Sequence, residues 1–264
     1  MENDDNKVDN LENSFLIYNH ESQTLKGFDY FIAWIKNFPI TALCIFISIV
    51  LYILVSYSTY FEFKSYPQEN AREYLAYIKY GAVLGGPSQE LLSQGQLWRL
   101  LVNVFHHGGF IHIFFNLTAM YVIGAYAEKY MGSIAYLIFI LLCGMGQEIA
   151  CQLTIEQGAI GISGVAFGIF GILMIIKNQD ANIKKFMTKE LIRSMIFQLI
   201  LFMFLTYFNI LNIANVGHIF GLFYGFFFAF TFYKSPSLIK KIFFVLVNLS
   251  IIPGLYYIYN NVIN

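Results

Sequence analysis

Seven long apolar stretches constrain this chain more than any other feature of its sequence. They cover about residues 39–58, 110–127, 133–152, 162–177, 194–211, 213–233 and 239–259. A helix of roughly 20 mostly apolar residues crosses a hydrocarbon core of about 30 Å. Backbone polar groups find no partner in lipid, and these stretches are too long for barrel strands, so they are expected to be helices. The sequence therefore predicts an all-α fold, a polytopic transmembrane helix bundle. The lipid bilayer is its expected surroundings and partner.

Composition excludes other classes of protein. Hydrophobic residues make up 58% of the chain and charged residues 12%, which does not fit an ordinary soluble globule. The zero net charge gives no basic footprint for a nucleic acid, and none is expected as a partner. Cys44, Cys143 and Cys151 lie in or beside apolar stretches and are interpreted as small buried hydrophobes. Residues 1–26 are polar and lack the apolar segment of a cleavable signal peptide.

The distribution of lysine and arginine predicts the orientation. If the N-terminus is cytoplasmic, the inner segments hold 12 of the 16 basic residues, and the other four lie in the long connection at 59–109. Cytoplasmic loops are enriched in these residues, so we expect a cytoplasmic N-terminus and, after seven spans, an external C-terminus. The long connection contains Gly85-Gly86-Pro87 and Leu91-Leu92. We expect it to be partly helical and to lie at the interface, with Trp98-Arg99 as an amphipathic anchor.

Three of the apolar stretches carry polar residues that a bilayer should exclude: His112 with Asn116, Ser163, and His218. Such groups cost free energy in a membrane unless they are paired or wetted, so they indicate a functional site. In the expected orientation all three stretches run inward, and helix rise places these residues within roughly 10 Å of the outer surface. A serine and a histidine at matching depth are candidates for a nucleophile and its base.

Glycines provide a way to bring Ser163 and His218 together. Gly161 and Gly164 flank Ser163 at a helix start, where free amides and the helix dipole can stabilise an oxyanion. Two glycine rows, Gly164, Gly168 and Gly171 on one helix and Gly217, Gly221 and Gly225 on the other, favour close approach. Hydrogen-bond distance between hydroxyl and imidazole is what an activated nucleophile requires. Bland alternatives stay open here: a serine bonded to its own helix, a histidine that links helices or binds a metal, and glycines that only pack.

His112 and Asn116 are four residues apart and therefore share one face of a helix. Both are hydrogen-bond donors of the kind used in an oxyanion hole, although a structural polar pair explains them equally well. His106 and His107 precede them, but no carboxylate or thiol stands at ligand spacing, so neither a metal site nor a cofactor is expected.

The neighbourhood of His218 predicts a dyad rather than a triad. Glu148 is the only carboxylate near this depth, and it is interpreted as an interfacial group. Phe167 lies one turn after Ser163 and could offer its ring to the imidazole, although a lone aromatic in a membrane helix more often belongs to the core. Packing would then orient the imidazole.

In their order along the chain, these residues resemble the rhomboid family of intramembrane serine proteases. The matching motifs span about 98–230, and each is weak alone, but the ordered set is specific. They are Trp98-Arg99, His107 five residues before His112, His112-Ile-Phe-Phe-Asn116, Gly124-x-x-x-Glu128-x-x-x-Gly132, Gly161-Ile-Ser163-Gly164, and Asn215-Val-Gly-His218 followed by Gly221 and Gly225.

The resemblance implies roles for these residues. Ser163 would be the nucleophile and His218 the base, and His112, Asn116 and the Ser163 backbone N–H would form the oxyanion hole. Supporting positions would be Gly161, Gly164, Phe167, His107 and Asn215. Similar proteases often carry tyrosine where Phe167 stands, so ring stacking would survive without a phenolic hydrogen bond.

The resemblance also implies an architecture and a substrate class. A short polar cytoplasmic segment at 1–38 would precede a six-helix core at 39–233 and an extra C-terminal helix at 239–259. The substrates would be single-pass transmembrane proteins, cleaved near the outer face of a plasma membrane, with Leu205 to Ile213 as a side gate. The oligomeric state stays open.

Two other functions are compatible with the sequence. A catalytically inactive relative would bind membrane clients, although such proteins typically lack the serine or the histidine that this chain keeps. A transporter would also place polar groups at membrane depth, but here they gather near one surface and the two halves of the chain show no repeat.

Overall fold

The structure is a computed structural model that describes residues 27–65, 94–155, 159–234 and 237–258. All regular elements within these ranges are helices, which confirms the predicted all-α bundle. In chain order they are α2 (Phe28–Asn37), α3 (Pro39–Ser65), α7 (Arg99–Val102), η2 (Asn103–Phe105), α8 (Phe110–Ala119), η3 (Met120–Gly124), α9 (Ala125–Met131), α10 (Ser133–Ile155), α11 (Ser163–Ile176), α12 (Ala181–Phe186), α13 (Lys189–Tyr207), α14 (Asn215–Ala229), η4 (Phe230–Lys234) and α15 (Leu238–Ile258).

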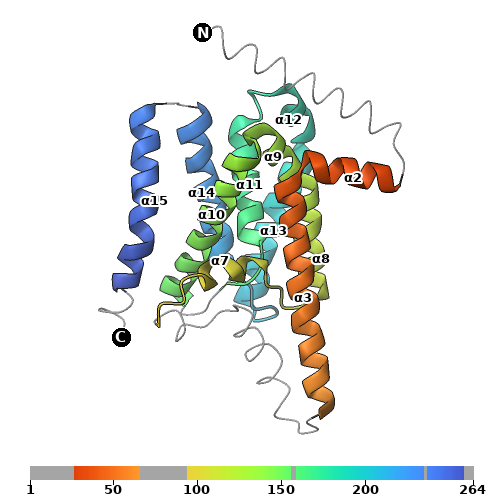
Figure 1. Ribbon diagram of the computed structural model, residues 1–264. Coiled ribbons are helices and arrows are strands. Elements are labelled where there is room, and N and C mark those ends of the chain that lie inside the picture. The colour runs from red at the N-terminus through yellow and green to blue at the C-terminus, as the bar shows by residue number, and fades with distance from the viewer. Residues whose placement is uncertain (1–26, 66–93, 156–158, 235–236, 259–264) are drawn as a thin grey trace.

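Within the described ranges, five helical segments are long and apolar enough to cross a membrane, and the chain is a multi-pass membrane protein. They are Pro39–Tyr57, Phe110–Met131, Ser133–Thr154, Lys189–Tyr207 and Asn215–Tyr233. The predicted fourth stretch forms α11, which is shorter at 14 residues, and the seventh forms α15, with 21 residues. The long helices stand side by side in one bundle (Figure 1).

The fifth span differs most from its predicted range of 194–211. The α13 helix begins at Lys189, because the Thr188 hydroxyl accepts a hydrogen bond from the Leu191 amide at 3.2 Å and caps its first turn. It ends at Tyr207, and the chain then turns through Asn209, whose φ is 54°. Hydropathy alone places this span too late, because the polar first turn is helical and the apolar residues after Tyr207 are not.

The α11 helix forms the centre of the bundle. Side chains such as Ile169, Ile172 and Leu173 on its different faces are fully buried. In Figure 1 the longer helices, among them α10, α13 and α14, surround it. The three cysteines are free and buried, as expected of small hydrophobes.

The α2 helix, which no predicted stretch covers, lies across the end of α3 (Figure 1). Its Trp34 is buried, and the indole ring lies 4.9 Å from the ring of Tyr121. The start of α3 is held by Glu128, whose carboxylate accepts hydrogen bonds from the Ile40 and Thr41 amides at 2.9 and 2.8 Å. A buried carboxylate at a helix N-terminus satisfies amides that have no partner within the helix.

The predicted interfacial connection is described only in part. Residues 94–105 contain α7 and η2, which agrees with a partly helical segment. Trp98 is half exposed, and the Arg99 guanidinium lies 4.7 Å from the centre of its ring. Gly85-Gly86-Pro87 and Leu91-Leu92 lie outside the described residues.

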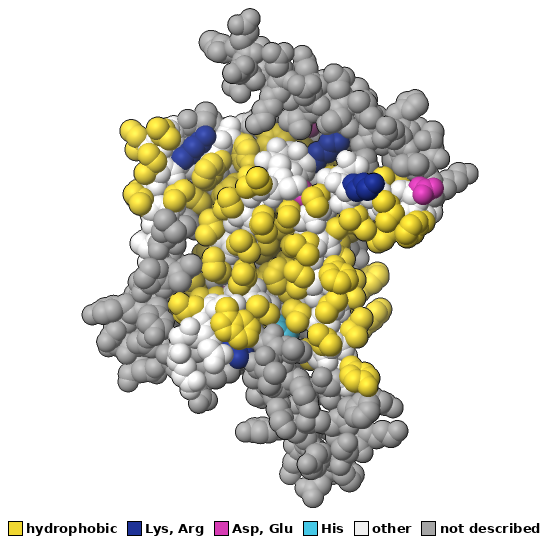
Figure 2. Space-filling view, viewed as in Figure 1, with side chains coloured by type: hydrophobic (Ala, Val, Ile, Leu, Met, Phe, Trp, Pro, Cys, Tyr) yellow, Lys and Arg dark blue, Asp and Glu magenta, His cyan; other side chains and the backbone are white. Residues whose placement is uncertain are grey.

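On the face shown in Figure 2, basic side chains of the described residues gather near one end of the bundle. Most of the lysine and arginine atoms visible in Figure 2 lie near the end that carries α2 and α12, and hydrophobic side chains cover the middle of that face. This distribution is typical of a protein whose apolar belt lies in a bilayer.

Candidate active site

Ser163 and His218 are joined by a hydrogen bond, with 2.8 Å between Ser163 Oγ and His218 Nε2. Ser163 is the first residue of α11, and His218 lies in the first turn of α14. His218 is 5% exposed, and its other ring nitrogen, Nδ1, has no hydrogen-bond partner in the described part of the chain. With the proton on Nδ1, the Nε2 lone pair faces the hydroxyl, which is the arrangement that a general base needs.

Glycine contacts between α11 and α14 explain why this pair can meet. A Cβ atom on Gly221 would overlap the backbone oxygen of Gly164, and one on Gly225 would overlap the oxygen of Gly168. The two backbones are therefore in direct contact, with no room for a side chain between them. Small residues permit this approach in membrane helices.

Two aromatic rings flank the imidazole of His218. The ring of Phe167 lies 5.0 Å from it and the ring of Phe202, from α13, lies 5.4 Å from it. Phe167 is one of the predicted supporting residues. Phe202 was missed, and no signal in the sequence separates it from the other phenylalanines of its apolar stretch.

His112 and Asn116 both point at the backbone just before Ser163. Gly161 has a φ of +102°, and a Cβ atom there would lie 2.7 Å from His112 Nε2 and 2.9 Å from Asn116 Nδ2. The Gly108 amide donates to His112 Nδ1 at 3.4 Å, so the proton of the neutral ring is on Nε2, the nitrogen nearer Gly161. The buried Asn116 Nδ2 has no hydrogen-bond partner among the described residues. Two hydrogen-bond donors, His112 Nε2 and Asn116 Nδ2, thus converge beside Ser163, and the side-chain amide of Asn116 is available to donate to a ligand.

His107 and Asn215 lie behind this pocket. His107 Nδ1 bonds the Phe105 carbonyl oxygen at 3.0 Å, and its ring lies 5.0 Å from the ring of His112. Burial, together with the neighbouring His112, lowers the pKa of His107 to about 3, so the ring is neutral. Asn215 Nδ2 donates to Thr206 Oγ1 at 2.8 Å and thereby ties the start of α14 to α13.

Glu148 corrects one prediction. It is fully buried rather than interfacial, and its carboxylate accepts hydrogen bonds from the side chain of Asn103 and the amide of Ala159. It does not bond His218, whose Nδ1 stays unpaired. Its neighbour Gln147, which was not among the predicted site residues, donates to the Gly161 carbonyl oxygen at 3.1 Å.

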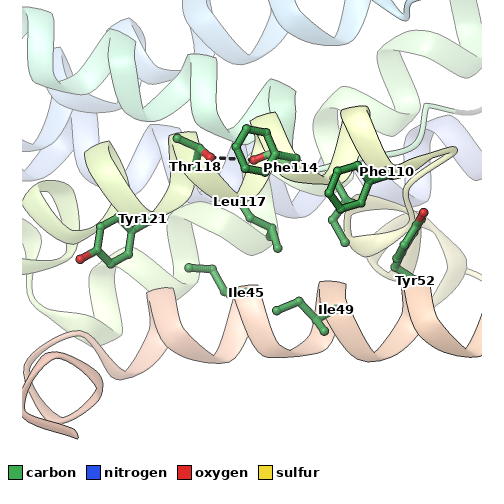
Figure 3. A pocket seen from close by; sticks show the side chains of 9 residues that line it. Ile45, Ile49, Tyr52, Phe110, Phe114, Leu117, Thr118 and Tyr121 are labelled. Atoms are coloured by element: carbon green, nitrogen blue, oxygen red, sulfur yellow. Dashed lines mark hydrogen bonds between the residues drawn. The ribbon is translucent and has the colours of Figure 1, made fainter. Parts of the chain in front are cut away.

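A separate apolar groove of about 440 Å³ lies between α3 and α8 (Figure 3). It is lined by residues such as Ile45, Ile49, Phe114 and Leu117, and it contains none of the site residues described above. In the ranges that the structure describes, no cluster of three or more His, Cys, Asp or Glu side chains could hold a metal ion.

A bundle of membrane-length helices in which a half-buried serine is hydrogen-bonded to a buried histidine defines a multi-pass membrane protein with a polar site. Residues 94–235, more than half of the chain, match the Rhomboid domain. The chain therefore belongs to the Rhomboid family.

Individual relatives show the range within this family. The chain is 34% identical over 143 residues to rhomboid protease GluP of Bacillus subtilis, which covers 54% of this chain and 27% of GluP. It is 27% identical over 197 residues to rhomboid protease GlpG of Pectobacterium atrosepticum, covering 74% and 63%. It is also 27% identical over 138 residues to inactive RHOMBOID-like protein 8 of Arabidopsis thaliana, covering 51% and 39%. The chain thus spans less than two thirds of the length of each of these relatives.

Proposed function

We propose that this protein is an intramembrane serine endopeptidase that cleaves single-pass transmembrane proteins near the outer membrane face with a Ser163–His218 dyad. The 2.8 Å hydrogen bond between the two side chains, inside a membrane helix bundle, is the observation that carries the proposal. The names of GluP and GlpG, both rhomboid proteases, support it.

The first half of the reaction forms an acyl-enzyme. His218 Nε2 takes the hydroxyl proton as Ser163 Oγ attacks the scissile carbonyl carbon. The negative charge that develops on the carbonyl oxygen is stabilised by Asn116 Nδ2, by His112 Nε2–H and by the Ser163 amide. The imidazolium then gives its proton to the leaving amine, the C–N bond breaks, and the acyl group stays on Ser163.

The second half releases the new carboxyl end. Water attacks the acyl carbonyl while His218 Nε2 takes one of its protons, and the same donors stabilise the second oxyanion. Collapse returns the proton to Ser163 Oγ. Because His218 Nδ1 has no carboxylate partner in the described chain, the flanking rings of Phe167 and Phe202 orient the imidazole.

The proposed topology places the N-terminus in the cytoplasm and the catalytic pair near the outer face of the plasma membrane. Supporting it, α2 and α12, which carry Lys36, Lys184 and Lys185, lie at the same end of the bundle (Figure 1), where most of the basic atoms visible in Figure 2 gather. Basic residues favour the cytoplasmic side.

The decisive test uses purified protein in proteoliposomes with a model single-pass substrate and a fluorophosphonate probe. The wild type is expected to cleave the substrate and to take the label. Ser163→Ala and His218→Ala are expected to lower the cleavage rate by at least about 10³-fold, as in other serine hydrolases. Thr154→Val serves as a control, since the exposed Thr154 bonds only its own helix. Cleavage by Ser163→Ala at the wild-type rate would sink the proposal.

A non-catalytic, client-binding role is the second candidate, favoured by the similarity to a relative named inactive. It predicts capture of the membrane substrate without cleavage or labelling. Both catalytic side chains are present here, so the same assay separates the two candidates.

A further inference from the structure

Glu148 is a buried carboxylate that the dyad does not use. It lies near the end of α10 with no exposed surface. Its Oε2 accepts from the Ala159 amide at 2.8 Å, and its Oε1 accepts from Asn103 Nδ2 at 2.9 Å and from Gln152 Nε2 at 3.0 Å. A buried carboxyl group is costly unless its oxygens are hydrogen-bonded, and these three donors satisfy both oxygens of Glu148.

Two of those donors lead to the loop that precedes Ser163. Ala159 is part of that loop, and Asn103, besides its side-chain bond to Glu148, accepts the Gly161 amide on its backbone oxygen at 3.2 Å. From the other side, Gln147 Nε2 donates to the Gly161 carbonyl oxygen at 3.1 Å. The peptide groups on both sides of Gly161 are therefore held.

The conformation that these contacts hold is an unusual one. Gly161 has a φ of +102°, a backbone conformation that favours glycine. A glycine can also adopt many other backbone conformations, so contacts are needed to hold this one. His112 Nε2 and Asn116 Nδ2 aim at this same residue. A shift of Gly161 would therefore move the Ser163 amide relative to both donors.

We propose that Glu148 is a positioning residue: with Asn103 and Gln147 it clamps the loop at 159–161 and so sets the geometry of the oxyanion pocket around Ser163. The inference rests on the proposed proteolytic function and deepens it. Glu148 touches no reacting atom, and its effect passes through the loop.

Two substitutions at this position separate hydrogen bonding from bulk and charge. Glu148→Leu keeps the approximate size but removes every acceptor. Glu148→Gln keeps an acceptor for Ala159, and Asn103 and Gln152 can turn their amides over, because Asn103 Oδ1 and Gln152 Oε1 have no other partner among the described residues. The glutamine variant can therefore retain all three bonds.

The expected result is a split between kcat and KM. In proteoliposomes, Glu148→Leu should lower kcat by about 10- to 100-fold with KM within about twofold, since a small misplacement of catalytic groups costs that much. Glu148→Gln should stay within about threefold of wild type. Gln152→Leu is the matched control, because Gln152 bonds the same carboxylate but not the loop, and its kcat should be unchanged.

A second variant covers the case in which Glu148→Leu does not fold. Gln147→Met keeps a similar length and removes the donor to the Gly161 carbonyl oxygen, so it should also lower kcat. Wild-type kcat in both Glu148→Leu and Gln147→Met would overturn the clamp. An equal loss of kcat in Glu148→Gln and Glu148→Leu would also overturn it. So would a loss of kcat in proportion to the fall in melting temperature across the variants.

Amide hydrogen exchange keeps this proposal distinct from the proposed function. Glu148→Leu should raise exchange at 159–161 by at least about tenfold, whether or not the protein cleaves anything. If the wild type neither cleaves nor labels, the proteolytic function fails, and the exchange result still decides whether Glu148 holds the loop. Unchanged exchange in an active enzyme would remove the clamp alone.

Discussion

The two helices that flank His218 are held in opposite ways. Eleven of the 14 residues of α11 are buried, against one of the 19 residues of α13. The α11 helix meets α14 backbone to backbone at glycines, whereas α13 reaches α14 through a few side chains, chiefly Phe202 and the Thr206–Asn215 hydrogen bond. Helix α11 is thus fixed against α14 by close packing, whereas α13 is held against α14 by a few separate side-chain contacts.

This difference indicates a division of tasks. The catalytic pair needs a fixed separation, and direct backbone contact provides it without side chains that can change rotamer. A substrate helix must enter from the membrane, and a helix with little buried surface is the one that moves most cheaply. The family-based expectation of a side gate near Leu205 to Ile213 falls on that helix and its following turn, and it stays a prediction.

The largest expected effect comes from breaking the packed interface. Gly221→Val places a side chain against the Gly164 oxygen, so α11 and α14 must separate and the Ser163–His218 bond is lost. We expect cleavage to fall by about 10³-fold or more. Substrate cleavage with purified protein measures this. Ile200→Phe, which adds bulk to an exposed position of α13, should leave the rate within about twofold. Equal losses in the two variants would contradict the division proposed above.

A smaller effect is expected when the pH is lowered, because the buried His107 stays neutral in the folded protein. His107 has a pKa of about 3 in the folded protein, against 6.5 as an ordinary value, and its neighbours include His112 and His106. The unfolded chain takes up a proton below pH 6.5 and the folded one does not until about pH 3, so stability falls as the pH drops through this window. At pH 4.5 the neutral state of His107 lowers the free energy of unfolding by on the order of 2 kcal/mol relative to pH 7. The melting temperature should fall less between pH 7 and pH 4.5 for His107→Gln than for the wild type. An identical fall in the two proteins would contradict a role of His107 in this loss of stability.

The next effect tests the aromatic attachment of α13. Phe202→Ala removes one of the two rings beside His218. An aromatic contact is worth about 0.5–1.5 kcal/mol, so kcat should fall by roughly 2- to 10-fold if this ring orients the imidazole. The control is Phe204→Ala, from an exposed position on the same helix. A loss confined to KM would assign Phe202 to substrate contact instead.

The smallest effect concerns the polar attachment. Thr206→Val leaves Asn215 Nδ2 with only the Phe202 carbonyl oxygen, at 3.3 Å. It also removes the bond from the Thr206 hydroxyl to that oxygen within α13, but such a bond back into its own helix adds little to helix stability. One hydrogen bond contributes about 0.5–1.5 kcal/mol, so amide exchange in the last turns of α13 should rise by up to about tenfold. Exchange in α11 should not change. Equal rises in both helices would show that they open as one unit.

Much of the fold could be predicted from the sequence because hydropathy acts locally. Long apolar runs must be helical in lipid, and each predicted stretch contains a helix of the structure. The exceptions have local causes. The first turn of α13 is polar, so hydropathy does not detect it. The α2 helix has apolar residues but only 10 positions, too few to predict a membrane span.

The site divides along the same line. Ser163, His218, His112 and Asn116 stood out because polar groups are expensive in a membrane, and the glycine rows showed how two helices could approach. Phe202 gave no signal, because it resembles every other phenylalanine of its span. Gln147 is a polar side chain within an apolar stretch and so carried the same signal as Ser163, but it belongs to no motif. Glu148 was visible, but its environment was misjudged, since burial depends on what packs around a residue.

The sequence by itself determined that this chain forms membrane helices and which residues could carry chemistry, because the cost of a polar group in lipid is a property of that residue and its neighbours along the chain. Only the tertiary structure decided that Ser163 Oγ lies 2.8 Å from His218 Nε2, that two rings flank the imidazole, and that a buried carboxylate holds the loop before the serine. These contacts join segments that meet only in the folded chain. The Ser163–His218 contact exists because glycines let α11 and α14 touch, at a separation that no local pattern can measure.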